Sequence, residues 1–241
     1  MEQNTPQPHA QTTFSPTHPA TPMLQAVLFD LDGTLANTDP IHIKVWRDIL
    51  EPEGYTVDDA FFKEHISGRL NEYLIKELLP QLSAAEGAQL VIDKEAKFRE
   101  LAASELTRMS GFDELYDWIQ HHELKTAVVT NAPRANAEFV LNILQLDTAF
   151  DYLLIAGELP RSKPDPLPYQ TALERFNLAP EDAIVFEDSK TGIQSAVSAQ
   201  IPTVGVASTH AADVLYGYGA SLVIDRFNDQ RLQKLGLLRT T

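Results

Sequence analysis

The sequence predicts an α/β protein with a doubly wound, mostly parallel sheet and an inserted helical bundle. The chain opens with a short apolar run, residues 26–29, that has the length and composition of a buried strand. About 70 residues with helical spacing and no evident strand follow it. From residue 112 onward, apolar strands alternate with amphipathic helices, which is typical of a parallel sheet covered on both faces.

Composition limits the kind of protein this is. The 241 residues include no cysteine, which excludes disulfides and thiolate chemistry. The formal net charge of −15 argues against nucleic acid and anionic membrane surfaces as partners. No apolar run approaches the roughly 20 residues of a membrane span. We expect a cytoplasmic monomer whose N-terminal residues 1–23, rich in Pro, Thr and Gln, form a disordered tail without the features of a signal peptide.

Residues 39–109 are expected to form a separate helical bundle, inserted between two core segments, 24–38 and 110–237. Apolar residues recur at helical spacing in two stripes, Ile41, Val45 and Ile49 in the first and Leu70, Leu74 and Leu78 in the second. Ser83 and Glu86 form a capping box that begins a long helical segment running towards Met109. The connections to the core are expected near residues 38–40 and 110–111.

The second half of the chain supplies the remaining elements of the sheet and its covering. Strands are predicted at residues 125–130, 152–156, 183–186, 203–206 and 221–224. Helices are predicted at residues 113–121, 136–144, 168–176 and 191–199.

Asp30 and Asp32 directly follow the first strand, and Gly33 and Thr34 signal a turn after it. Side chains alternate along a strand, so both carboxylates emerge on the same side, at the end where open α/β sheets bind ligands. Two such carboxylates repel each other unless a cation lies between them, and an oxygen-only site suits Mg²⁺. The alternative is a solvated acidic turn.

Two later patterns also place polar residues after a buried strand or before a helix. Thr130 and Asn131, with the free N–H groups of the next helix, would hold a phosphate oxygen, or they are an ordinary helix cap. Lys163 lies in a loop whose prolines restrict its direction, although a solvated loop lysine is the alternative.

Glu187, Asp188 and Ser189 follow the strand at 183–186. Asp188 is a candidate third carboxylate for a hard cation, with Glu187 beside it, and Ser189 is the expected helix cap. Acidic residues at a helix start are also favoured by the helix dipole, which is the alternative. Each pattern is ambiguous alone, but four of them in one sheet indicate a single site.

The four patterns together resemble the motifs of the haloacid dehalogenase-like (HAD) phosphohydrolase superfamily, from about residue 23 to residue 237. They are Asp-Leu-Asp-Gly-Thr at 30–34, Thr-Asn at 130–131, Lys-Pro at 163–164 and Glu-Asp-Ser at 187–189. The order of the motifs and the helical insert also match. The sequence is most similar to the β-phosphoglucomutase-like branch and its sugar-phosphate phosphatases. The resemblance implies a Rossmann-like core with a helical cap.

This resemblance also implies a mechanism. Asp30 would attack the substrate phosphorus and form an aspartyl-phosphate. Asp32 would protonate the leaving oxygen and then activate water. Dehalogenases of the superfamily lack an acid at that position because halide leaves without a proton, so Asp32 favours an oxygen leaving group. The expected substrate is a small phosphorylated metabolite, in particular a sugar phosphate.

The resemblance further implies which residues hold Mg²⁺ and the negatively charged phosphoryl oxygens. Mg²⁺ would be held by Asp30, Asp188 and the backbone carbonyl of Asp32. The other phosphoryl oxygens would be bound by side chains of the second and third motifs, namely Thr130, Asn131 and Lys163.

The resemblance implies that the cap recognises the leaving group through a specificity loop at residues 65–71. Arg69 in this loop is a candidate for binding a sugar hydroxyl or a second phosphate, or is a surface arginine. His42 occupies the position of a substrate-facing histidine in β-phosphoglucomutase-like enzymes, or is an ordinary helix residue. Lys94 loosely matches a cap lysine of the mutases. Relatives usually carry Gly where this chain has Gln200, just past a helix end.

Three alternatives to a phosphatase remain. A phosphosugar mutase shares the first half-reaction, but the short stretch at 68–71 looks more like the phosphatases. A signalling receiver domain also uses an acidic pair, Thr and Lys, yet it carries its phosphorylated Asp on a later strand and has no large helical insert. A non-catalytic sugar-phosphate-binding protein would have no need for both Asp30 and Asp32.

Overall fold

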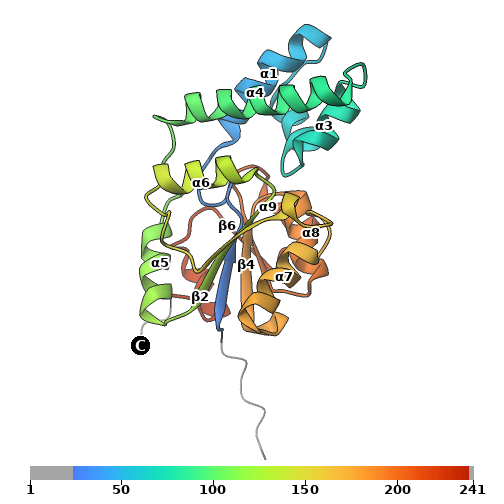
Figure 1. Ribbon diagram of the computed structural model, residues 1–241. Helices are drawn as coiled ribbons and strands as arrows, with labels where there is room; N and C mark the ends of the chain where they lie inside the picture. The colour runs from blue at the N-terminus through green and yellow to red at the C-terminus, as the bar shows by residue number, and fades with distance from the viewer. Residues whose placement is uncertain (1–23, 239–241) are drawn as a thin grey trace, which may run out of the picture.

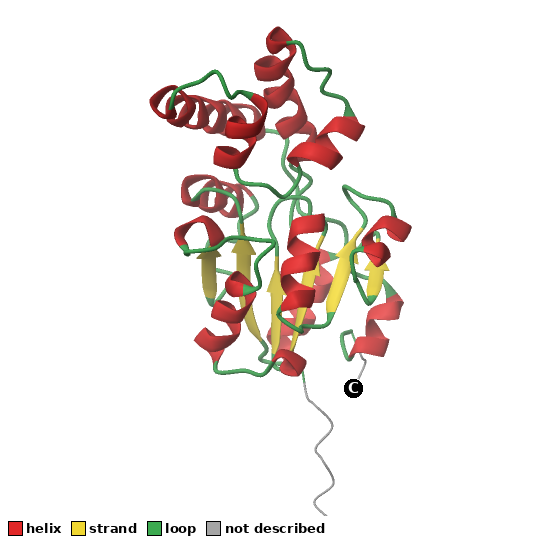
Figure 2. Cartoon of the chain, turned by 90° about the vertical axis from the view of Figure 1, so that its right-hand side faces the viewer, coloured by secondary structure: helices red, strands yellow, loops and turns green. Residues whose placement is uncertain are grey.

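The computed structural model describes residues 24–238, and its centre is a six-stranded parallel sheet (Figures 1 and 2). The order is β3-β2-β1-β4-β5-β6. The strands are β1 (Ala26–Phe29), β2 (Lys125–Thr130), β3 (Tyr152–Ile155), β4 (Ala183–Glu187), β5 (Thr203–Val206) and β6 (Leu222–Ile224). Because the chain fills β2 and β3 on one side of β1 before β4, β5 and β6 on the other, the strand order reverses at β1. Open α/β sheets bind their ligands at such a reversal.

Helices cover both faces of the sheet, so the predicted doubly wound α/β class is confirmed. Leu115 of α5 and Val140 of α6 pack on one face, and Tyr169 of α7 and Ala196 of α8 pack on the other. The helices of the core are α5 (Phe112–His121), α6 (Arg134–Ile143), α7 (Leu167–Phe176), α8 (Lys190–Ser198) and α9 (Ala212–Gly217). Short 3₁₀ turns complete the core at Ala156–Glu158, Pro180–Asp182 and Gln230–Leu235.

The remaining helices lie beyond the carboxyl ends of the strands, at the top of Figures 1 and 2. They are α1 (Asp39–Leu50), α2 (Asp59–Phe61), α3 (Asn71–Leu78) and α4 (Ala84–Ala102), with a 3₁₀ turn at Glu51–Glu53 and a π-helical turn at Phe62–Ile66. Their apolar side chains form a cluster of their own around Trp46, Leu50 and Leu74. We propose on this basis that residues 39–109 are a cap domain, as the sequence predicts. The tail expected at 1–23 lies outside the described residues.

The two crossings between core and cap are joined to each other. Ala36 and Arg108 form an antiparallel bridge, and the Met109 amide donates to the Leu35 carbonyl at 2.9 Å. The predicted long segment running towards Met109 is present as α4, but the helix ends at Ala102, and a turn at 103–105 leads the chain to this pairing. The capping box of Ser83 and Glu86 at the start of α4 is confirmed.

Gln200 has the left-handed backbone that its place after α8 predicts, with a φ of 64°. This conformation costs a residue with a Cβ about 1 kcal/mol, so we expect Gln200→Gly to raise the free energy of unfolding by about that amount. Gln194→Gly within the same helix is the matched control and should lower it, because glycine there only adds backbone entropy to the unfolded chain. Urea unfolding measures the change in the free energy of unfolding for both variants. A change in the same direction for both would contradict the left-handed backbone assigned to Gln200.

In the part of the chain that the structure describes, no helix has both the length and the apolar character needed to span a bilayer.

Candidate active site

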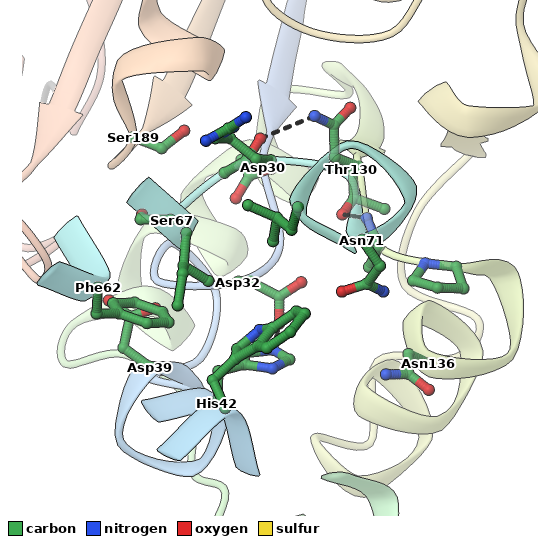
Figure 3. Close-up of a pocket in the computed structure, with 18 of the residues that line it drawn as sticks. Asp30, Asp32, Asp39, His42, Phe62, Ser67, Asn71, Thr130, Asn136 and Ser189 are labelled. Carbon is green, nitrogen blue, oxygen red and sulfur yellow. Dashed lines mark hydrogen bonds and ion pairs between the residues drawn. The ribbon is translucent and has the colours of Figure 1, made fainter. Parts of the chain in front are cut away.

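A cavity of about 680 Å³, counted with its solvent-open part, lies between the carboxyl ends of the strands and the cap helices. Figure 3 shows Asp30 at the end of β1 facing this cavity, with Asp32 and His42 close to one another on its other side. The core lines it with the four predicted motif regions, and the cap lines it with residues from α1, the loop at 67–69, α3 and α4.

Lys163 connects two of the motifs inside the protein. Its Nζ donates to Asp30 Oδ1 at 2.7 Å, to Glu187 Oε1 at 2.6 Å and to the Val129 carbonyl at 2.6 Å. Burial alone would lower the pKa of Lys163, but the charges of Asp30 and Glu187 raise it overall. The lysine is therefore a fixed cation beside Asp30 and not the solvated loop residue of the alternative interpretation.

Glu187 positions Lys163 and is itself held on both oxygens. Its Oε1 also accepts from the Tyr169 hydroxyl at 3.1 Å. Its Oε2 accepts from the Asp188 amide and from the amide and hydroxyl of Ser189 at 3.1–3.2 Å. Gly192, in the first turn of α8, leaves room for this carboxylate, because a Cβ at that position would overlap it.

Asp188 offers a free ligand atom next to Asp30. Its Oδ2 accepts from the Thr209 hydroxyl at 2.5 Å, but its Oδ1 is buried without a hydrogen-bond partner. Oxygens of Asp30, Glu187 and Asp188 lie within 4.8 Å of one another. Burial, reinforced by the neighbouring carboxylates, raises the pKa of Asp30 and of Asp188 well above the usual range. A bound cation would relieve this repulsion, so the donors present fit Mg²⁺.

Gly33 allows the chain to approach Asp188 closely. Its φ of 76° is in the left-handed region, and a Cβ there would overlap the Asp188 carboxylate. The turn after β1 therefore brings the backbone of the first motif against the fourth motif. This close contact is the structural reason for glycine at position 33.

Asp32 is directed away from that carboxylate group and towards the cap. Its Oδ1 lies 3.7 Å from His42 Nε2 on α1, and the His42 ring stacks on Phe98 at 4.2 Å between centroids. Burial alone would raise the pKa of Asp32, but hydrogen bonding and charge from His42 lower it overall. The two aspartates of the first motif therefore have opposite environments. The predicted metal contact through the Asp32 backbone carbonyl stays a prediction.

The second motif reaches the same cavity. The Thr130 hydroxyl accepts from the Ala132 amide at 2.9 Å, which leaves its own proton directed elsewhere. The Asn131 amide group donates to the Gly68 carbonyl of the cap at 2.9 Å. Both residues line the cavity, and their binding to a phosphate stays a prediction.

The predicted motifs thus meet around the Asp30 carboxylate, the Lys163 cation that pairs with it and the unpartnered oxygen of Asp188. A model of the haloacid dehalogenase-like hydrolase family matches residues 27–206. The chain belongs to this family. The prediction of the family and of a hydrolytic enzyme is thereby confirmed.

Relatives within the HAD family include phosphatases and a mutase. A phosphorylated carbohydrates phosphatase from Thermotoga maritima is 32% identical over 182 residues, which cover 74% of this chain and 82% of the relative. A validoxylamine A 7′-phosphate phosphatase from Streptomyces hygroscopicus subsp. limoneus is 32% identical over 193 residues, 80% of this chain and 90% of the relative. The solved β-phosphoglucomutase from Clostridium difficile has a TM-score of 0.78 at 25% identity, covering 89% of this chain and 96% of that chain.

The loop at 65–71, whose role in specificity stays a prediction, contacts the core of this HAD-family hydrolase. Gly68 has a φ of 71°, and its carbonyl accepts from Thr191 as well as from Asn131, at 2.7 and 2.9 Å. A Cβ on Gly68 would overlap the Thr191 hydroxyl. Arg69 lines the cavity, and its guanidinium donates to Glu77 at 2.5 Å and to the His65 carbonyl at 2.8 Å. Its binding to substrate stays a prediction.

Sequence reasoning missed several polar residues of the HAD site. Thr209 follows β5 and contacts Asp188, so the signal that identified the other motifs, polar residues after a strand, was present there too. Glu95 on α4 and Asn136 on α6 are buried at the cavity and hydrogen-bonded to each other. No local pattern distinguishes these two from the other polar residues of their helices.

Proposed function

We propose that this protein is a Mg²⁺-dependent phosphatase that hydrolyses small phosphate monoesters, in particular sugar phosphates, through an aspartyl-phosphate intermediate. The observation that carries the proposal is the pairing of Asp30 with the buried Lys163, beside Asp188 and its unpartnered oxygen. The phosphatases among the relatives support the same reaction class.

The first step follows from the surroundings of Asp30. One carboxylate oxygen is held by Lys163 at 2.7 Å, which leaves the other to attack phosphorus. Asp30 and Asp188 would hold Mg²⁺, which would neutralise charge on the transferring group. Lys163, the Thr130 hydroxyl and backbone N–H groups at the start of α6 would hold the remaining phosphoryl oxygens as their charge grows.

Asp32 would act as the general acid and then as the general base. His42 holds its carboxylate on the cap side of the cavity, where the leaving group would lie. The lowered pKa of Asp32 keeps its carboxylate ionised in the free protein, so it would have to take up a proton as the ester binds. It would donate this proton to the departing sugar oxygen and later take one from the attacking water. In this proposal the cap helix α1 takes part in proton transfer through His42, which lies next to Asp32.

A panel of sugar phosphates tests the function, with phosphate release measured with and without Mg²⁺. We expect release to stop when EDTA removes the metal and to return with excess Mg²⁺, because Asp30 and Asp188 repel each other without it. A second readout is independent of turnover. Mg²⁺ should raise the Tm of the wild type, and it should raise that of Asp188→Asn less.

The same panel separates the alternatives. β-Glucose 1-phosphate should be followed for conversion to glucose 6-phosphate, since isomerisation without phosphate release would make the protein a mutase. An intact protein that turns over no ester while binding sugar phosphates would instead be a binding protein.

A further inference from the structure

The cations that line the active-site cavity are all neutralised by carboxylates of the chain. In the part of the chain that the structure describes, the lysine and arginine side chains lining it are Arg69, Lys94 and Lys163. Lys163 is paired with Asp30 and Glu187 on the core side. The other two belong to the cap, where the leaving group of a phosphate ester would lie.

Lys94 is paired with its neighbour Glu95 on α4, and both are buried. Lys94 Nζ lies 2.7 Å from Glu95 Oε1 and 3.3 Å from His42 Nδ1. Glu95 also accepts from the side-chain amides of Asn71 on α3 and Asn136 on α6. Burial alone would raise the pKa of Glu95, but the Lys94 charge lowers it overall, so the carboxylate is ionised at neutral pH.

Arg69 is paired with Glu77, whose carboxylate lies 2.5 Å from the guanidinium. Its other contact is with the His65 carbonyl. The side chain that is placed best for a second phosphate is therefore already occupied by an anion of the cap itself.

Apart from Asp39 and His42 on α1, the other cap-side groups that line the cavity are uncharged, and Asp39 accepts from the Thr209 hydroxyl on the core side. Hydrogen-bonding side chains are supplied by Ser67, Asn71 and Asn136, which lie around the cavity in Figure 3. Apolar walls are supplied by Trp46, Phe62, Ile66 and Leu74. Amides and hydroxyls beside apolar walls suit a polyol, whose hydroxyls both donate and accept and whose C–H face is apolar.

We propose that the enzyme selects uncharged polyol leaving groups, and that Glu95 and Glu77 are the residues that exclude substrates carrying a second anionic group. This inference rests on the proposed phosphatase function. A carboxylate or second phosphate in the cavity meets Glu95 and finds no free cation, whereas a hydroxyl meets the two asparagines. Like charges placed together are an effective means of rejecting a wrong partner.

The test uses two substrates that differ in one group. Sorbitol 6-phosphate and 6-phosphogluconate have the same carbon chain, and a terminal hydroxymethyl in the first replaces the carboxylate of the second. We expect kcat/KM for phosphate release to be at least about tenfold higher for sorbitol 6-phosphate. Glu95→Gln and Glu77→Gln should each narrow this ratio at least about threefold, by freeing Lys94 or Arg69 to bind the carboxylate.

Glu100→Gln is the matched control, because Glu100 is on the same helix as Glu95 but is exposed and pairs only with Lys97 on the surface. The ratio of kcat/KM for the two substrates in Glu100→Gln should equal that of the wild type. Glu77 is half-exposed, so its variant decides the question even if Glu95→Gln fails to fold.

Equal kcat/KM for the two substrates would overturn this inference while leaving the phosphatase function intact. The same narrowing in Glu100→Gln would also overturn it, because the effect would then be one of net charge. Absence of phosphate release from both substrates and from the sugar phosphate panel would overturn the proposed function itself.

Discussion

Asp30→Asn is expected to lower kcat for every phosphate ester by at least about 10⁴-fold, because the amide cannot attack phosphorus. Lys163 keeps its contacts with Glu187 and the Val129 carbonyl, so the fold should be preserved. Steady-state phosphate release and circular dichroism measure the two effects. Asp48→Asn, on the exposed side of α1, is the control and should match the wild type. A variant at position 30 that keeps more than about a tenth of kcat would rule out the nucleophile assignment.

Asp32→Asn should behave differently, and the difference separates the two carboxylates. A sugar leaving group needs a proton, so the variant should be nearly inactive on sugar phosphates. p-Nitrophenolate leaves without one, so p-nitrophenyl phosphate should still phosphorylate Asp30. Water activation is then impaired, and intact-protein mass spectrometry should detect an accumulating phosphoenzyme. Detection of a phosphoenzyme in Asp30→Asn instead would assign the nucleophile to another residue.

Gly192→Ala is expected to damage both stability and catalysis, although the change adds one methyl group to a helix. The new Cβ would displace the Glu187 carboxylate and break its buried contacts with Lys163 and Tyr169. We expect a loss of about 2–4 kcal/mol in the free energy of unfolding, because a buried ion pair is disrupted. Lys163 would then lose its fixed position beside Asp30, and kcat should fall about 10²-fold.

Gly217→Ala is the matched control for that substitution. Gly217 is also helical, and nothing lies within 4 Å of where its Cβ would be. Alanine there should be neutral or slightly stabilising. Urea unfolding and steady-state kinetics give the free energy of unfolding and kcat of the two variants. Equal values for both variants would show that the position of Glu187 does not depend on the space at Gly192.

The chemistry of the core was predictable because it follows strand ends, which sequence patterns locate well. Boundaries of α5 to α8 and of the last five strands differ from their predicted positions by no more than two residues. The parallel sheet then brings Asp30, Lys163 and Asp188 together without further information. Thr209 follows the same rule, but it lies three residues beyond the end of β5 and not directly after it.

The cap side was not predictable, for a physical reason. Glu95 and Asn136 belong to helices that are far apart in the sequence, and each is one polar residue among many on its helix. Their burial depends on how α4 packs over α6, which no local pattern encodes. The pairing of Arg69 with Glu77 depends in the same way on how the loop at 67–69 turns back towards α3.

The bridge between Ala36 and Arg108 has a mechanical consequence. Two separate linkers would let the cap tilt, twist or slide over the core, whereas two hydrogen-bonded ones act as a single hinge. Rotation about a hinge displaces each atom in proportion to its distance from the axis. The start of α1 follows Ala36 closely in the chain, so His42 should travel little relative to Asp32. Gly68 lies farther along the chain and should move more, once its carbonyl is released from Asn131 and Thr191. We therefore expect the entrance for the sugar to open widely with the proton-transfer pair still assembled.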